Sequence, residues 1–163
     1  MRDFEDFIAA RGASLMRFAL MLCGDPHRAE DLVQTALARV YPRWGRISAM
    51  ERPEAYVKTV LVHDHLRWWR RRSSGEVPVA QPREVPTADP STAHAARDAA
   101  WRLLGSLPRQ QRAVLVLRYY EDLPDSEIAE ILHCKPGTVR SLASRALANL
   151  RESLPHLDKE ALP

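Results

Sequence analysis

The sequence lacks the features that mark several large classes of protein. It contains two cysteines, Cys23 and Cys134, which give neither a disulfide framework nor the ligand spacing of a zinc site and which fit a reducing cytoplasm. No apolar run approaches the length that spans a membrane, so we expect no membrane insertion. Acidic residues at the start argue against a secretory signal peptide. We therefore expect a cytoplasmic protein.

Strand patterns are missing as well. No segment shows convincing two-residue alternation or hairpin chemistry, whereas apolar residues recur at steps of three and four. The clearest helix covers residues 26–41, where Asp25 can cap the first turn and Pro26 suits the first helical position. Residues 45–52 are expected to form a loop. The pattern predicts an all-α fold.

The composition changes in the middle of the chain. Prolines recur every four residues among Ser, Gly, Glu and Thr, at Pro78, Pro82, Pro86 and Pro90. Such a sequence forms a semi-extended linker without a core of its own. We therefore predict two small helical domains, 1–72 and 96–155, joined by a flexible linker, 73–95, with a tail at 156–163.

The second domain contains a pattern typical of a helix-turn-helix. Two short apolar stripes are separated by Pro136 and Gly137, and the preceding helix should turn Ala113, Val114, Leu117 and Tyr120 inward. The segment between Lys135 and Arg151 has no acidic residue. Arginines can bind guanine edges and cations can hold phosphates, so the second helix fits duplex DNA in the major groove. An ordinary helical hairpin with a solvated basic face is the alternative.

The first domain contains two further polar patterns. The helix at 26–41 has an outer face of charged and amide side chains, which is either solvated surface or a docking face for another protein. A helix starting at Pro53 ends in Arg67-Trp68-Trp69-Arg70-Arg71-Arg72. Aromatics beside arginines suit single-stranded nucleic acid, because bases stack on the rings and phosphates pair with the cations. A core tryptophan with arginines on the solvent side explains the same pattern equally well.

A metal site is the weaker interpretation of His63-Asp64-His65. Helical positions two apart face different directions, and no other ligand cluster accompanies them. We expect structural histidines, no bound metal and no cofactor.

Four motifs in order resemble one family. They are Ala29-Glu-Asp-Leu-Val-Gln-Thr-Ala-Leu-Ala-Arg-Val40, Trp68-Trp-Arg-Arg-Arg72, Leu107-Pro-Arg-Gln-Gln-Arg-Ala-Val-Leu-Val-Leu-Arg-Tyr-Tyr-Glu-Asp122 and Gly137-Thr-Val-Arg-Ser141. Together they resemble the extracytoplasmic-function (ECF) sigma factors of the sigma-70 family, in particular the actinobacterial SigE type. The resemblance covers nearly the whole chain.

The resemblance implies a fold, partners and residue roles. The two domains would be a sigma-2 helical bundle and a sigma-4 helix-turn-helix, and the protein would bind core RNA polymerase, through the β′ clamp helices and the β flap, and promoter DNA. An anti-sigma factor is a further partner found among relatives. The polymerase contacts would be Glu30, Asp31, Gln34, Thr35 and Arg39. The −10 contacts would be His63, Arg67, Trp68, Trp69, Arg70 and Arg71. The −35 contacts would be Arg118, Lys135, Thr138, Arg140, Ser141, Ser144 and Arg145.

Some positions depart from the usual residues of that family. His63 replaces an asparagine, His133 a turn glycine, Lys135 a serine cap, and Pro124 a serine or threonine cap. The main alternative function is a free-standing LuxR-like helix-turn-helix regulator, which needs neither the polar face at 26–41 nor the tryptophan-rich helix. An enzyme of the His-Asp phosphohydrolase kind has only His63-Asp64-His65 in its favour. We expect no catalytic residues and no enzymatic activity.

Overall fold

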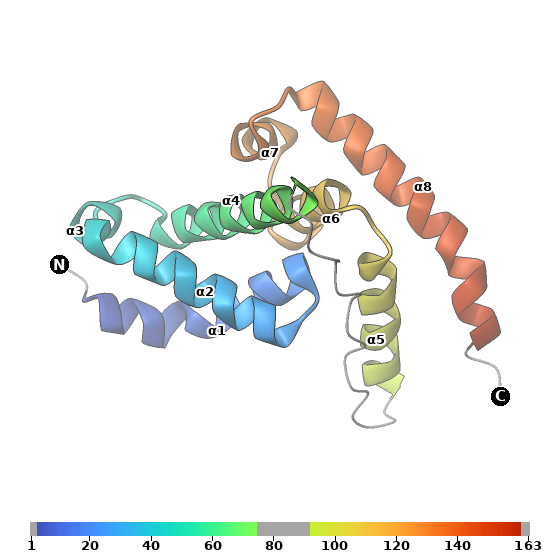
Figure 1. The fold of residues 1–163 in the computed structure, drawn as a ribbon, viewed down its shortest axis with the longest axis horizontal. Coiled ribbons are helices and arrows are strands. Elements are labelled where there is room, and N and C mark those ends of the chain that lie inside the picture. The colour runs from blue at the N-terminus through green and yellow to red at the C-terminus, as the bar shows by residue number, and fades with distance from the viewer. Residues whose placement is uncertain (1–2, 75–91, 161–163) are drawn as a thin grey trace. The chain divides into compact units, whose positions relative to one another are not determined.

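The computed structural model describes residues 3–74 and 92–160, and all regular secondary structure in these ranges is helical (Figure 1). The chain divides into two compact units, residues 1–81 and 82–163. The helical secondary structure confirms the all-α prediction. The described part contains no helix that is long and apolar enough to cross a membrane.

The first unit is a bundle of three long helices. They are α1 (Phe4–Cys23), α2 (Pro26–Val40) and α4 (Pro53–Ser74), and each of them packs against the other two (Figure 1). Buried residues on their apolar stripes include Leu15, Phe18 and Leu22 of α1, Val57 and Leu61 of α4, and small or branched residues of α2. The three/four spacing of these residues is what puts them on one face of each helix.

The turn between α1 and α2 has the chemistry that its sequence predicts. Gly24 has a left-handed backbone with φ of 73°, and its N–H bonds to the Leu20 carbonyl at 2.8 Å. The Asp25 carboxylate then accepts the His27 N–H at 2.9 Å, and Pro26 occupies the first position of α2. Glycine and an acidic cap thus satisfy backbone groups that adjoining helix ends leave unpaired.

The segment after α2 is more ordered than expected. Residues 41–43 form a short 3-10 turn, η1, and α3 (Trp44–Ile47) is a single helical turn, so the loop predicted at 45–52 begins only after Ile47. Trp44 and Ile47 are both buried, and the Trp44 ring lies 4.6 Å from that of Phe7. The loop prediction was wrong here because burial of these two side chains, one turn apart, favours the helix over an open loop.

The second unit is built around the longest helix, α8 (Pro136–Glu160). Helices α5 (Thr92–Gly105), α6 (Arg109–Leu115) and α7 (Asp125–Leu132) all pack against α8 (Figure 1). Small side chains of α8 at Val139, Ala143 and Ala146 are buried, which lets the neighbouring helices approach closely. The proline-rich residues 75–91 lie outside the described residues, as do 161–163, whereas α5 begins before the expected start of the domain and α8 continues past residue 155.

Tyr120 of the second unit is exposed, although the sequence predicts that it faces the core. After α6 the chain forms a π-helical turn, η2 (Val116–Tyr120), in which the Glu121 N–H bonds to the Val116 carbonyl at 3.1 Å. Ala113, Val114 and Leu117 are buried as predicted, but Tyr120 is 44% exposed. The wider turn changes the angle between successive residues and rotates Tyr120 out of the core.

A polar network at Glu54 joins α4 to α1. The Glu54 carboxylate accepts the Ser14 hydroxyl at 2.7 Å and pairs with Lys58 at 3.0 Å and Arg11 at 3.3 Å. Burial by itself raises the pKa of this carboxyl, but the Ser14 hydrogen bond and the two cations outweigh it and hold the pKa below its ordinary value.

We predict a pH-dependent stability from this network. A lowered pKa means that the ionised carboxylate stabilises the fold above the unfolded-state pKa of about 4.3, and that this contribution is lost as pH falls through the folded-state value. Glu54→Gln should therefore lower the unfolding free energy more at pH 7 than at about pH 3, measured by urea unfolding. The exposed Glu51→Gln is the control, and an equal Glu54→Gln effect at both pH values would contradict the prediction.

Candidate functional site

The turn between α7 and α8 is closed by a histidine in an unusual conformation. His133 has φ of 54° and ψ of 46°, the left-handed region that favours glycine, and it ends α7. The next N–H, of Cys134, reaches back to the Ala129 carbonyl at 3.0 Å. The Lys135 carbonyl then accepts the Thr138 and Val139 N–H groups at 2.9 and 3.2 Å as α8 begins. The turn thus forms with His133 in the left-handed conformation and with the Lys135 carbonyl supplying the first hydrogen bonds of α8.

The start of α7 also uses backbone instead of a side-chain cap. The Pro124 carbonyl accepts N–H groups from Glu127 and Ile128, both at 3.1 Å. Asp125 and Glu127 lie in the first turn, where their charges complement the positive end of the helix dipole. Asp125 in addition binds the Arg118 guanidinium, with Nη2 and Oδ2 3.3 Å apart. Arg118 is half-buried, so the structure brings it to the amino end of α7 instead of leaving it in solvent.

The outward face of α8 carries the side chains that the sequence assigned to duplex DNA. The residues assigned to this face are all exposed, while Val139, Ala143 and Ala146 on the opposite side are buried. The surface of α8 that can enter a major groove is therefore basic and hydroxyl-bearing. Its members are Thr138, Arg140, Ser141, Ser144 and Arg145 of α8, together with Lys135 just before the helix.

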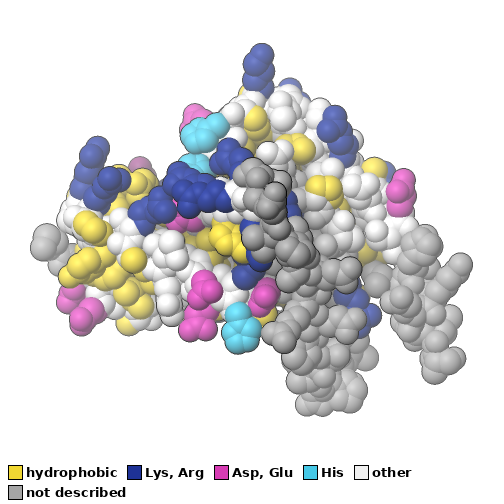
Figure 2. Space-filling model, in the orientation of Figure 1, with side chains coloured by type: hydrophobic (Ala, Val, Ile, Leu, Met, Phe, Trp, Pro, Cys, Tyr) yellow, Lys and Arg dark blue, Asp and Glu magenta, His cyan; other side chains and the backbone are white. Residues whose placement is uncertain are grey.

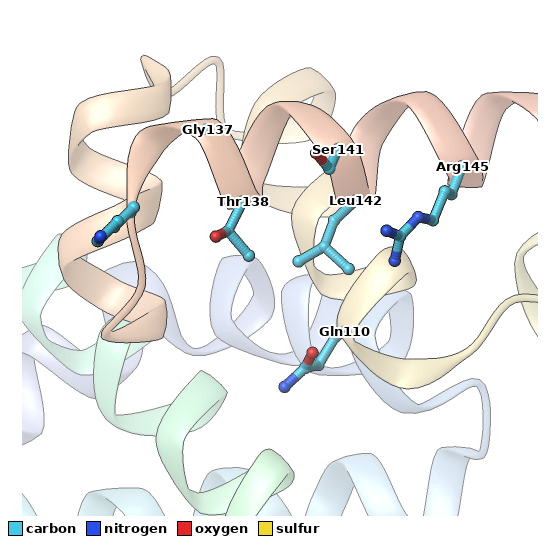
Figure 3. Close-up of a pocket in the computed structure, with 7 residues that line it drawn as sticks. Gln110, Gly137, Thr138, Ser141, Leu142 and Arg145 are labelled. Carbon is cyan, nitrogen blue, oxygen red and sulfur yellow. The ribbon is translucent and has the colours of Figure 1, made fainter.

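A shallow groove of about 490 Å³ runs along one edge of this face (Figure 3). Thr138, Ser141, Leu142 and Arg145 of α8 line it, and Gln110 of α6 lies across from them. Sequence reasoning missed Gln110, because a glutamine within a helical stretch gives no signal of its own. Its place in the groove depends on how α6 packs against α8, which the Gln111–Asn149 hydrogen bond at 2.8 Å helps to fix.

The polar face of α2 is exposed over most of its length. Glu30, Asp31, Gln34 and Thr35 are all exposed, and the Gln34 amide donates to Glu30 at 3.4 Å. Arg39, which was expected with them, is exposed as well, and its Nη2 lies 3.2 Å from Oδ1 of Asp64 on α4. This ion pair was not foreseen from the sequence, which gives no sign that the two helices meet there.

The tryptophans near the end of α4 are both half-buried and in contact with arginine. The Arg28 guanidinium of α2 lies 3.1 Å from the ring centre of Trp68, and that of Arg72 lies 4.6 Å from it. Trp69 meets Trp68 edge to face, with ring centres 4.6 Å apart. Both tryptophans thus take part in packing, and Trp68 is covered by an arginine of α2.

Charged side chains occupy the remaining surface of α4. Arg67, Arg70 and Arg71 are exposed, and Lys and Arg side chains gather over α4 on the face drawn in Figure 2. His63 is half-buried, whereas Asp64 and His65 next to it are buried. No group of three or more potential metal ligands occurs within residues 3–74 and 92–160.

Comparison with known proteins shows the family. The family model described as Sigma-70 region 2 matches residues 7–75, and the one described as Sigma-70, region 4 matches residues 97–150. The RNA polymerase sigma-E factor of Streptomyces coelicolor is 41% identical over 159 residues, which cover 98% of this chain and 90% of that relative. The chain belongs to the ECF sigma factors of the sigma-70 family.

Two solved structures have the same fold. The sigma factor RpoE of Bartonella quintana, crystallised with the anti-sigma factor NepR, matches with a TM-score of 0.69 at 22% identity, over 95% of this chain and 98% of that chain. The sigma factor SigJ of Mycobacterium tuberculosis matches with a TM-score of 0.62 at 29% identity, over 91% of this chain and 54% of that chain.

Membership of the family defines the general function. The protein is a non-catalytic subunit that binds core RNA polymerase and promoter DNA and directs the initiation of transcription. The region 2 match also decides against the free-standing LuxR-like regulator, because a helix-turn-helix regulator of that kind does not need a sigma-70 region 2.

We predict that His133→Gly stabilises the second unit. A non-glycine residue in the left-handed region costs about 1–2 kcal/mol, part of which glycine returns as extra freedom of the unfolded chain. The net gain in unfolding free energy should be about 0.5–1 kcal/mol, measured by urea unfolding of the full chain. The control is His27→Gly in the first turn of α2, where the backbone is helical and glycine should lower the stability of the first unit. A loss of stability with His133→Gly would contradict the prediction.

Proposed function

We propose that the exposed face of α8 reads the −35 element of the promoter. The observation that supports this role is a continuous outward surface of arginines and hydroxyls without an acidic residue between Lys135 and Arg151. Arg140 and Arg145 are suited to guanine edges, the hydroxyls of Thr138, Ser141 and Ser144 to bases or phosphates, and Lys135 to phosphate. Arg118, which is paired with Asp125 at the start of α7, contacts the DNA backbone.

The basic part of α4 meets the −10 element in this proposal. Strand opening requires unpaired bases and the sugar-phosphate backbone to be held, and the exposed Arg67, Arg70 and Arg71 supply cations for the phosphates. His63, half-buried one turn before Arg67, contacts a base of the opened −10 strand in the same proposal. Trp68 and Trp69 contribute through their packing against arginine, which keeps this part of α4 in position.

The docking surface for core polymerase is the polar face of α2. Glu30, Asp31, Gln34 and Thr35 are exposed together and offer charge and hydrogen bonds to the β′ clamp helices. The second unit contacts the β flap, and residues 75–91 connect it to the first unit.

An anti-sigma factor that covers the α2 face is a further proposed partner, because masking this face would prevent docking. The protein works in the cytoplasm, where its polymerase acts.

The first test concerns Arg140. If it reads a base, Arg140→Ala should weaken −35 recognition by about 1–3 kcal/mol and relax the sequence preference. The measurement is transcription by reconstituted holoenzyme on a library of promoter fragments with randomised −35 positions. An equal loss on every sequence would instead mark Arg140 as a phosphate contact. Ser153→Ala, at a half-buried hydroxyl bonded to the Asn149 carbonyl, is the control on the same helix.

The second test concerns the docking face. Asp31 is exposed on α2, so Asp31→Arg should leave the fold intact while reversing a charge that faces the polymerase. We expect the affinity for core polymerase to fall by about tenfold or more, measured by competition against wild-type protein. Glu5→Arg makes the same charge change on the exposed side of α1 and should have little effect. Unchanged binding by Asp31→Arg would remove this face from the interface.

A further inference from the structure

Two arginines of α2 contact the part of α4 that is proposed to open the promoter. Arg39 pairs with Asp64 at 3.2 Å, and the Arg28 guanidinium covers the Trp68 ring at 3.1 Å. Asp64 and Trp68 are four residues apart and therefore lie on the same side of α4. Two arginines, one near each end of α2, therefore contact consecutive turns of α4.

The ion pair is asymmetric in burial. The Asp64 side chain is 7% exposed and that of Arg39 is 47% exposed. A buried carboxylate needs a compensating cation, because removal from water strongly disfavours the charged form. Among the described residues Oδ2 of Asp64 has no hydrogen-bond partner, so the compensation comes through Oδ1 and Arg39. Arg39 is therefore tied to α4 although it is partly exposed, whereas the hydrogen bond of Glu30 stays within α2, to Gln34.

We propose that Arg39 is a positioning residue for promoter opening. By holding Asp64 it fixes His63 and Arg67, which adjoin Asp64 along the chain and on the next turn, relative to the helix that docks on the polymerase. Arg28 acts in the same way at Trp68. The inference rests on the proposed roles of α2 and α4, and it assigns Arg39 to the coupling between them instead of to the polymerase interface itself.

The experiment compares two templates. Full-length Arg39→Gln and Asp64→Asn are each assembled with core polymerase and assayed on a duplex promoter and on the same promoter with an unpaired −10 region. We expect each variant to lose about tenfold on the duplex, because the ion pair is broken, and less than about twofold on the pre-opened template. Core affinity should be unchanged, the double variant should lose no more than either single one, and Arg39→Lys should retain most of the activity.

Two control variants and two overturning results separate the possible outcomes. Arg17→Gln removes a charge from an exposed position of α1 and should have no effect on either template. A defect of Arg39→Gln on both templates with reduced core affinity, while Asp64→Asn stays active, would overturn the inference and make Arg39 a polymerase contact. A parallel loss on both templates together with a lower melting temperature would also overturn it, by showing a merely structural pair. Normal core binding by Asp31→Arg would instead count against the proposed docking face.

Discussion

Burial of one narrow side of each helix is the constraint on which the rest of this structure depends. In the second unit, Val139, Ala143 and Ala146 of α8 are covered by the neighbouring helices, and this contact fixes how α8 is rotated about its axis. Once that rotation is fixed, the residues on the opposite side must face outward. The surface proposed to read DNA is thus set by a few small apolar side chains that never touch it.

The same constraint shapes the first unit, where the two sides of α2 have different surroundings. Its apolar stripe lies between α1 and α4 and its acidic and amide residues face solvent. The arginines at the edges of that outer face behave differently, since Arg28 and Arg39 turn toward α4 and contact Trp68 and Asp64. Long arginine side chains at the border between core and surface can pack through their stems and still place their charge on a partner.

The turns of the helix-turn-helix form without a glycine at residue 133 and without a side-chain cap at residue 124. His133 takes the left-handed backbone that glycine would adopt more easily, and the carbonyls of Pro124 and Lys135 supply the first hydrogen bonds of α7 and α8. The helix-turn-helix therefore forms with Pro124, His133 and Lys135 at these positions. The reason is that α7 and α8 are held by their buried faces, so that cap and turn chemistry adjusts the stability of the motif without deciding whether it forms.

Periodicity determined the all-helical class, the extent of α2 and the exposed faces of α2 and α8, and the chemistry of Asp25 and Pro26 determined where α2 starts, because these are properties of single helices. The family motifs added the general function. Tertiary packing alone decided that Trp44 and Ile47 form a helical turn, that a π turn exposes Tyr120, that Gln110 faces the α8 groove, and that Arg39 binds Asp64. Each of these depends on which residues distant in the sequence become neighbours, and the spacing of residues along one helix does not contain that information.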